Sequence, residues 1–307
     1  MQHSWIWLTL FAALLQAVRT AAQKRLAERL STLAATYVRA LFGLPFMVVY
    51  LVLLGVPEAS GIASGGMIFF GTCIVAALTQ NLGTAALLSL YRTRNFAVAN
   101  QLARTNLVFT AVLGTLFFSE VIAFAGWIAI ALTLAGAAVL SAEQTPAGSG
   151  GRGIAGLLSA IDGASLRTGL FVGAMFGLCN LMIREATQAL GMASAIERGA
   201  VTVVTVTGLQ VVMLGGWLAV REPGFLARIW NERRIALLVG LTSALGSIAW
   251  FAAFALTNAS YVIAVGQVEA VFTVLISTFY FREKLTPMEL GGIVAVIAGV
   301  LLFRLGA

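Results

Sequence analysis

The stretch that decides the fold is NASYVIAVGQVEAVFTVLISTFYFREKLTPMELGGIVAVIAGVLLF, residues 258–303, in which a short charged turn joins two apolar runs. Moved back by 163 positions, it aligns without a gap on residues 95–140, and ten of the 46 positions are identical. Six of the ten form the pattern V-F-T-x4-T-x2-F-x-E, which ends both times on a turn carboxylate, Glu120 or Glu283. The chain therefore contains a duplicated unit.

Composition places this duplicated unit in a membrane. The chain is 60% hydrophobic and 10% charged, with a mean hydropathy of +0.97, whereas a soluble domain carries roughly 25% charged residues. A membrane-spanning helix needs ~20 mostly apolar residues. Ten segments meet this requirement, so we expect an all-α integral membrane protein. These segments are 4–22, 33–54, 67–90, 96–118, 121–140, 168–189, 192–219, 234–256, 259–281 and 286–304.

The repeat divides the ten segments into two sets of five. Residues 1–141 form the first unit and residues 168–307 the second, while the Gly-, Ser- and Pro-containing residues 142–167 have the composition of a flexible linker. Because five is odd, the second unit must lie upside down relative to the first. The sequence thus predicts a 5+5 inverted-topology repeat, an architecture of secondary transporters that places the substrate site near the midplane.

The net charge of +7 does not indicate nucleic-acid binding. Thirteen Lys and Arg residues fall in the connections after the odd-numbered segments, and only three lie on the other side. Cytoplasmic loops of membrane proteins carry such an excess. We therefore predict that the odd-numbered connections of this multi-pass membrane protein lie in the cytoplasm and that both termini lie outside it.

The sequence contains no set of residues that indicates an enzyme. The single histidine, His3, lies at the chain start, and the two cysteines, Cys73 and Cys179, lie inside apolar segments. No Ser-His-Asp set, metal-ligand spacing or phosphate-binding loop can be assembled from these residues. We expect no catalytic activity, no metal and no cofactor, and transport driven by gradients rather than ATP.

The repeated F-T-x4-T-x2-F-x-E pattern, the tight charged turn and the Gly-containing closing helix resemble the EamA-type branch of the drug/metabolite transporter superfamily. The resemblance covers nearly the whole chain and implies a ten-helix carrier of small metabolites in the bacterial inner membrane, commonly working outward. Many members have a proline two residues before the Phe, where this chain has Leu107 and Ala270, and a glycine before the turn Glu, where it has Ser119 and Arg282. Without the proline, no kink is expected in segments 96–118 and 259–281.

Polar residues inside the segments are the candidate substrate ligands, because burying them in lipid is costly without a use. They include one cation, one anion, several amides and an aromatic ring, a set that suits a small polar or amphipathic, amino-acid-like metabolite. The predicted ligands are Arg104, Glu269, Asn100, Gln101, Gln80, Asn81, Asn180, Gln267 and Trp250.

Further polar residues lie near the ends of the first two segments. Gln16, Arg19, Thr20 and Gln23 share one helical face, and they either line the cavity or extend toward the cytoplasmic interface. Arg39, near a segment end, is interpreted as an interfacial anchor.

Glu269 and Arg104 each lie roughly 14–17 Å into a ~30 Å hydrocarbon core at 1.5 Å per residue. In one reading they form a buried ion pair that only holds the helices together. In the other the pair lines the cavity, and Glu269 exchanges a proton or a substrate ammonium group during transport, which makes protons the candidate coupling ion. Glu120 and Glu283 are interpreted as structural groups that accept hydrogen bonds from backbone N–H groups of the following helix.

Other functions remain as alternatives. The first is a flippase, or a flippase subunit, for an anionic lipid carrier. A scaffold or sensor is disfavoured by the charges at mid-span. A channel is disfavoured because no ring of repeated charges lies at one level.

Overall fold

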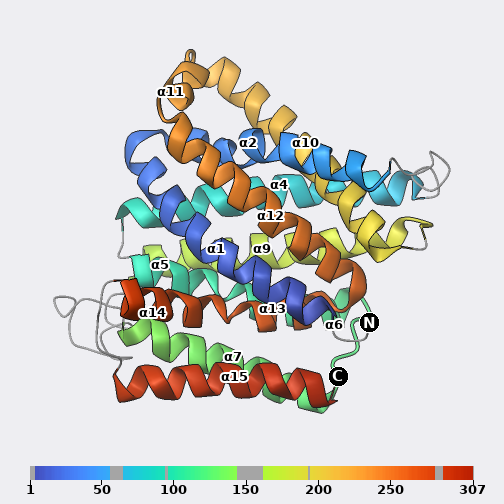
Figure 1. Cartoon of the computed structure of the whole chain (residues 1–307), viewed down its shortest axis with the longest axis vertical. Helices are drawn as coiled ribbons and strands as arrows, with labels where there is room; N and C mark the ends of the chain where they lie inside the picture. Colours follow the sequence, from blue (N-terminus) through green and yellow to red (C-terminus); the bar gives the residue numbers. More distant parts are fainter. Residues whose placement is uncertain are drawn as a thin grey trace.

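The computed structural model describes residues 4–55, 65–93, 96–143, 162–192, 194–280 and 286–306, and every regular element in these ranges is a helix (Figure 1). Seven of the described helices, α1, α2, α4, α7, α9, α10 and α12, are long and apolar enough to cross a membrane. The helices are α1 (Ser4–Arg29), α2 (Thr32–Leu53), α4 (Gly66–Thr93), α5 (Phe96–Ala103), α6 (Asn106–Phe117), α7 (Phe124–Glu143), α9 (Gly163–Ala189), α10 (Ala195–Arg221), α11 (Phe225–Asn231), α12 (Arg233–Leu256), α13 (Ala259–Gly266), α14 (Glu269–Tyr280) and α15 (Pro287–Gly306).

Two segments that the sequence predicted as continuous helices are broken. Segment 96–118 forms α5 and α6, and segment 259–281 forms α13 and α14, so the expectation of no kink was wrong. The breaks fall at the same place in the repeat. Helices of eight and twelve residues occur in both halves, and each of their four boundaries is displaced by the 163 positions of the sequence repeat.

Side-chain and short-range backbone hydrogen bonds accompany both breaks. Thr105 Oγ1 donates to the carbonyl of Leu102 at 2.7 Å, and Gln267 Nε2 donates to the carbonyl of Ile263 at 3.2 Å. The backbone N–H groups of Thr105 and Gln267 bond three residues back, to Leu102 and Ala264. Such bonds compete with the regular helical ladder and tighten the turn, so the helices break without proline.

Close contacts with neighbouring helices hold the breaks in place. A Cβ atom on Gly173 of α9 would overlap Thr105 Oγ1, and a Cβ atom on Gly266 would overlap the ring of Trp250 on α12. Gly173 therefore lets α9 lie against the break of the other half, and Gly266 makes room at the second break for a ring of its own half, as small residues commonly allow between membrane helices.

The two halves pack against each other in an exchanged pattern. Helix α1 packs on α12 and α9 packs on α4, while α2 packs on α12 and α10 packs on α4. The pair α7 and α15, one from each half, lies at one edge of the molecule (Figure 1). These main contacts of the first half with the second thus have counterparts with the roles reversed, which is the packing expected of two repeats related by a two-fold axis.

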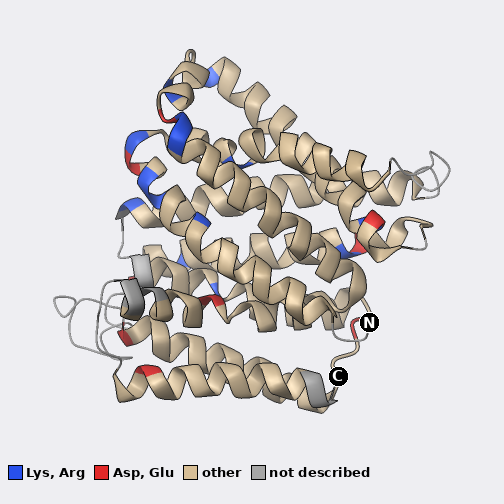
Figure 2. Cartoon of the chain, viewed as in Figure 1, with Lys and Arg blue, Asp and Glu red and all other residues tan. Residues whose placement is uncertain are grey.

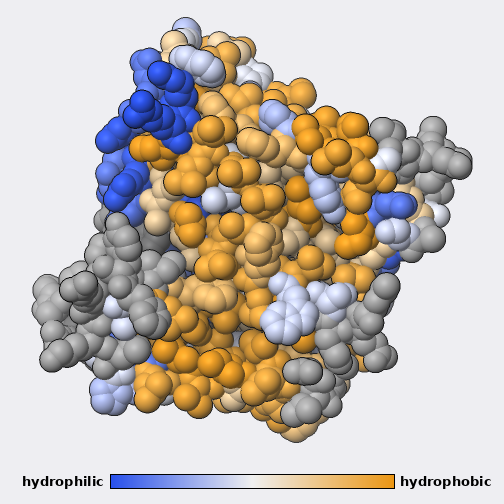
Figure 3. Space-filling view, in the orientation of Figure 1, coloured by the Kyte–Doolittle hydropathy of each residue, from blue (hydrophilic) through white to orange (hydrophobic). Residues whose placement is uncertain are grey.

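The surface has the polarity of a membrane protein. Figure 3 shows a broad apolar face that runs across the helices. Many large apolar side chains of the molecule are exposed, among them Trp7, Leu53, Val212 and Val294. Lys and Arg gather at one end of the helices, beside the C-terminal ends of α1 and α10 and beside α11 (Figure 2). This basic end is opposite the side where both chain termini lie (Figure 1).

The turn between α6 and α7 contains a strained residue. Ser119 has a φ of 52°, in the left-handed region that glycine adopts most readily. Glycine is the residue that the family resemblance gives at this position. The chain therefore keeps the turn conformation with a less suitable residue. The second turn, with Arg282 and Glu283, lies outside the described residues.

Candidate functional site

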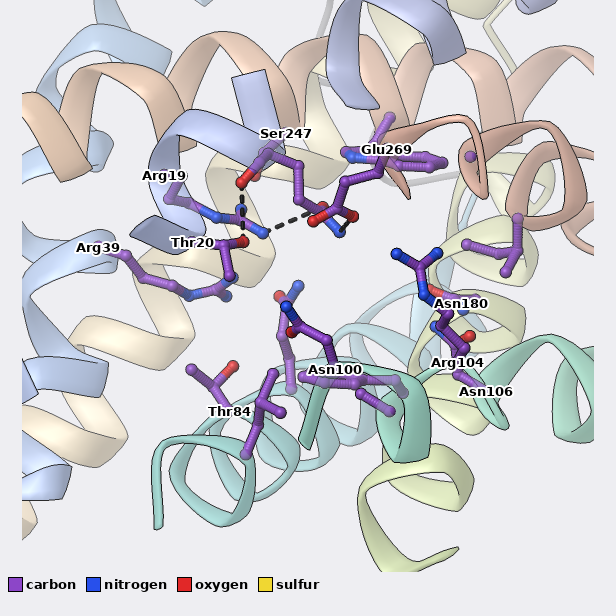
Figure 4. A pocket seen from close by; sticks show the side chains of 18 of the residues that line it. Arg19, Thr20, Arg39, Thr84, Asn100, Arg104, Asn106, Asn180, Ser247 and Glu269 are labelled. Carbon is purple, nitrogen blue, oxygen red and sulfur yellow. Dashed lines mark hydrogen bonds between the residues drawn. The ribbon is translucent and has the colours of Figure 1, made fainter. Parts of the chain in front are cut away.

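A cavity of about 160 Å³ lies where the two broken segments meet (Figure 4). Its wall includes residues of α1, α2, α4, α9 and α12 in addition to the two breaks, so both halves contribute. Irregular backbone inside a membrane is tolerated where it lines such a cavity. The lining residues are Gln16, Arg19, Thr20, Gln23, Arg39, Gln80, Thr84, Leu87, Leu88, Tyr91, Asn100, Ala103, Arg104, Asn106, Phe176, Asn180, Ile183, Ser247, Trp250, Phe251, Phe254, Ile263, Gly266, Gln267 and Glu269.

The two breaks contact each other through equivalent residues. Arg104 Nη1 donates to Gln267 Oε1 at 2.7 Å, and the two residues are 163 positions apart, the period of the repeat. A contact between equivalent positions must lie on the axis that relates the halves. The cavity is therefore centred at the junction of the two repeats, next to the N-terminal ends of α6 and α14.

Glu269 is held by a bridging amide. Gln16 Nε2 donates to Glu269 Oε2 at 2.8 Å, and Arg19 Nη2 donates to Gln16 Oε1 at 3.0 Å (Figure 4). The carboxylate and the Arg19 guanidinium are thus joined through Gln16. Within the described residues, no ion pair joins Glu269 and Arg104. The ion pair that both readings of these residues assumed is therefore not formed, because Arg104 bonds instead to the amide of Gln267.

A second chain of hydrogen bonds fixes Arg39. Its Nη2 donates to Gln210 Oε1 at 2.9 Å, and Gln210 Nε2 donates in turn to Gln80 Oε1, so the chain links α2, α10 and α4. Arg39 is only 7% exposed and lines the cavity. Its interpretation as an interfacial anchor was wrong, because the residue packs inward instead of reaching the membrane surface.

Other polar groups and aromatic rings complete the wall. Tyr91 Oη donates to Asn100 Oδ1, and Asn180 Nδ2 donates to Thr110 Oγ1 at 3.3 Å. Trp250 stacks on Phe254 with their ring centroids 5.9 Å apart. The cavity thus combines polar groups that can fix orientation with aromatic surface, as small-molecule sites do.

Seven of the nine ligands predicted from the sequence line the cavity: Arg104, Glu269, Asn100, Gln80, Asn180, Gln267 and Trp250. Gln101 and Asn81 are not among the lining residues. Both lie next to a lining residue on the same helix, and the neighbouring position on a helix points about 100° away.

The polar face of α1 had two interpretations from the sequence. Gln16, Arg19, Thr20 and Gln23 all line the cavity, so the cavity-lining alternative is the one that the structure shows. The spacing of 3, 4 and 7 residues carried the signal. No comparable spacing marked Arg39, and its position became evident only from the packing of α2 against α10 and α12.

Glu120 joins the two halves at the side away from the basic end. It is 2% exposed, and it accepts hydrogen bonds from the backbone N–H groups of Ala259 and Ser260, at 2.7 and 3.3 Å. Arg184 Nε lies 3.5 Å from its Oε1. The carboxylate therefore caps the N-terminus of α13 in the other half, whereas we expected a contact with the following helix. Glu283 lies outside the described residues.

Neighbouring contacts extend this connection. Asn258 Nδ2 donates to the carbonyl of Val121 at 3.1 Å, and the N–H of Ala123 donates to Tyr261 Oη at 3.2 Å. Arg184 also donates to the carbonyl of Thr257 at 3.3 Å. The cavity lining extends in the other direction, along α1 to Gln23 and along α4 to Tyr91, toward the basic end.

No group of three metal-ligating side chains occurs in the part of the chain that the structure describes. The lining carries one carboxylate and no histidine or cysteine. These residues offer hydrogen-bond donors and acceptors to a polar organic molecule, but they form no set that matches the common metal geometries.

Comparison with known proteins agrees with this architecture. The EamA-like transporter family matches twice, at residues 3–142 and 167–305. No curated protein matches the chain. A solved structure described as "Crystal structure of protein" has a TM-score of 0.66 and 13% sequence identity, and the match covers 99% of this chain and 97% of that one. At this identity the likeness concerns the fold alone. The double family match, which spans almost all of the sequence, means that this chain belongs to the EamA-like transporter family, membrane transporters of the drug/metabolite type.

Proposed function

We propose that this protein is a secondary transporter that exports a small polar or amphipathic metabolite, amino acids among the candidates, across the bacterial inner membrane. The observation that carries the proposal is the cavity at the junction of the two repeats, lined by polar residues from two broken helices. Discontinuous helices around a midplane site are a feature of secondary transporters. No nucleotide-binding motif occurs in the sequence, so gradients drive the movement.

The proposed topology has ten crossing segments in two inverted sets of five. The seven long helices, the two broken segments and α15 make up the ten. Helix α1 starts on the side of the chain termini and α9 starts on the opposite side, which supports the inversion (Figure 1). The repeat units are residues 1–141 and 168–307, joined by residues 142–167, most of which lie outside the described part.

The basic end faces the cytoplasm in this proposal, and both termini lie outside it. The excess of Lys and Arg beside α1, α10 and α11 supports this orientation. The cavity then extends toward the cytoplasm, while Glu120 and its partners join the halves on the outer side. A carrier that loads substrate from the cytoplasm needs this arrangement in one of its states.

Glu269 is the proposed proton-exchanging group. It is the only carboxylate among the described lining residues, and one of its oxygens accepts from Gln16. A carboxylate at this depth can bind a proton or pair with a substrate ammonium group. Once it is protonated it is neutral, so it no longer pairs with the ammonium group. Competition between the two would couple proton entry to substrate exit.

The test is transport in proteoliposomes of purified protein. Labelled amino acids and other small metabolites are loaded inside or outside, with and without an imposed pH gradient. We expect movement of at least one compound class that exceeds the rate in protein-free vesicles and responds to the gradient. A protein that accelerates no compound under any gradient contradicts the proposal.

A further inference from the structure

The charges in the cavity are unequal. Three guanidinium groups, those of Arg19, Arg39 and Arg104, line it, and Glu269 is the only carboxylate among the described lining residues. The three arginines come from α1, α2 and the first break. Figure 4 shows Arg19 and Arg39 reaching the central space from one side and Arg104 from the other. An empty cavity therefore has an excess of two positive charges.

The neighbours of these arginines do not balance this charge. Arg19 bonds to Gln16, Arg39 to Gln210 and Arg104 to Gln267, and all three partners are neutral amides. An amide oxygen accepts a hydrogen bond but carries no net charge. A guanidinium buried in a membrane protein is costly unless an anion compensates it. The structure thus positions the arginines without neutralising two of them.

Most polar atoms of the cavity wall that lack a hydrogen-bond partner are also donors. The Nε atoms of Arg19, Arg39 and Arg104 and the Nε1 of Trp250 are buried and have no hydrogen-bond partner. All four are N–H donors on residues that line the cavity, so the unpaired polar groups of this wall are mainly donors. One lining acceptor, Asn106 Oδ1, also lacks a partner. It can receive a hydroxyl or ammonium group of a bound molecule.

From this arrangement we infer that the transported molecule is a small organic anion with two negative charges, carried either by two carboxylates or by one phosphomonoester group. The inference rests on the proposed transport function and specifies its substrate class. It narrows the small polar or amphipathic, amino-acid-like metabolite that the sequence indicated, because the fold adds Arg19 and Arg39 to the cavity. Acidic amino acids belong to the inferred class, since Glu269 and Asn106 remain for their ammonium group.

The first experiment compares acidic ligands with related compounds that lack the negative charge. Purified wild-type protein is titrated with succinate and succinamide, aspartate and asparagine, and glycerol 3-phosphate and glycerol. Binding is followed by the melting temperature, which a ligand of the folded state raises with the logarithm of its concentration relative to Kd. We expect at least one anion to bind roughly tenfold to a hundredfold tighter than its neutral partner, the factor for loss of one charge-assisted hydrogen bond.

The second experiment tests the arginines themselves. Arg19→Gln and Arg39→Gln should each weaken binding of the preferred anion at least tenfold and leave binding of its neutral partner unchanged. Arg29→Gln is the matched control, because Arg29 lies on the same helix as Arg19, has a 59% exposed side chain and pairs with Glu232 outside the cavity. It should bind the anion like the wild type. Arg39→Lys keeps the charge and should retain part of the affinity.

The phosphomonoester group has two sources, a soluble metabolite and a lipid headgroup. Glycerol 3-phosphate and dioctanoyl phosphatidic acid carry the same group, with and without acyl chains. Stronger binding of the soluble compound, with transport of it in proteoliposomes, supports a metabolite carrier. Binding of the lipid alone supports the anion site in a flippase.

The outcomes separate the inference from the proposed function. If neutral partners bind as tightly as the anions, or if only neutral or cationic compounds are transported, the anionic substrate class is wrong and the transporter stands. If the anions bind and depend on Arg19 and Arg39 but no compound is moved, the site stands and the transport function is wrong. A variant that fails to fold does not affect the wild-type comparison of ligand pairs, which is decisive alone.

Discussion

The broken segment of the first half, α5 and α6, and that of the second, α13 and α14, have the same helix lengths and the same break position. Their side chains at the break differ. The cation Arg104 in the first half corresponds to the amide Gln267 in the second. The amide Asn106 corresponds to the carboxylate Glu269. The comparison teaches that the backbone of the repeat is kept while its charges are divided: the first half supplies the cations and the second supplies the anion.

The largest effect is expected at the anionic side of this comparison. Glu269→Gln keeps the shape of the side chain and an oxygen that can accept from Gln16, but it removes the titrating group. We expect folding to be intact, gradient-driven accumulation to be abolished and substrate exchange between preloaded vesicles to persist. Accumulation and exchange are measured in the same proteoliposomes.

Glu185→Gln is the control for this variant. Glu185 lies on α9 outside the cavity lining, and its side chain is 34% exposed. The control should accumulate substrate like the wild type. Normal pH-dependent accumulation by Glu269→Gln would exclude proton exchange at this residue and leave it a structural role.

The next effect concerns the cap of α13. Glu120→Ala removes the acceptor of the Ala259 and Ser260 N–H groups and leaves Arg184 without this partner. Removing one partner of a buried ion pair destabilises a protein by about 3–5 kcal/mol. We expect a large fall in melting temperature and in folded yield, measured by thermal unfolding in detergent.

Glu185→Ala is the matched control for Glu120→Ala. Glu185 contacts the same arginine at 3.5 Å, but from a partly exposed position. Exposed pairs contribute about 0–1 kcal/mol, so this variant should melt close to the wild type. A Glu120→Ala protein that melts normally but does not transport would show that Glu120 acts in the transport cycle and not in stability.

A smaller effect is expected when the two breaks are made alike. Arg104→Gln places glutamine at both equivalent positions and removes one of the three cations. Loss of a hydrogen bond to a charged group costs about 1.5–3 kcal/mol, so the substrate Kd should rise roughly tenfold to a hundredfold. The measurement is substrate binding by melting temperature, at several ligand concentrations.

The exchanged variant, Arg104→Gln with Gln267→Arg, sharpens this prediction. The Arg–Gln hydrogen bond lies on the axis between the halves and is expected to form with the two side chains exchanged. The double variant should recover affinity relative to Arg104→Gln. Equal affinity of the single variant and the wild type would mean that the substrate does not contact this arginine.

The smallest predicted effect concerns the packing against the first break. Gly173→Ala introduces a methyl group that overlaps Thr105 Oγ1, and overpacking of this kind typically costs about 1–3 kcal/mol. Thr105→Ala removes the overlapping hydroxyl group and should restore part of the melting temperature. The control is Gly208→Ala on α10, where the added methyl group meets no neighbour within 4 Å. A Gly173→Ala protein as stable as the control would show that the break adapts freely.

The repeat and the all-helical membrane class could be predicted from the sequence, because each leaves a local signal. The same holds for the candidate ligands, since seven of the nine that were predicted line the cavity. A polar residue in an apolar segment can be recognised from that segment alone. The breaks were missed because no proline marks them and because part of the packing that holds them comes from other helices. The signal sought was proline, whereas Thr105 and Gln267 bend the chain with their own side chains while Gly173 and Trp250 pack from other helices.

The contact of Glu120 was missed for a related reason. Its partners at Ala259 and Ser260 lie 139 and 140 positions away, in the other half, whereas the following helix was the nearest donor along the chain. Arg39 was misplaced because a single charged residue near a segment end has the same appearance whether it faces lipid or protein. Both cases depend on which helix packs against which, and no pattern within one helix contains that information.

The Arg104–Gln267 hydrogen bond has a consequence for how such a molecule can be built. Two identical subunits around the same axis would bring each residue there against its own copy. Two arginines would repel each other, and two glutamines would leave no charge at the centre. One continuous chain places a donor on one side and an acceptor on the other. Covalent connection of the halves therefore allows a directional, charged centre that a homodimer of either half cannot form.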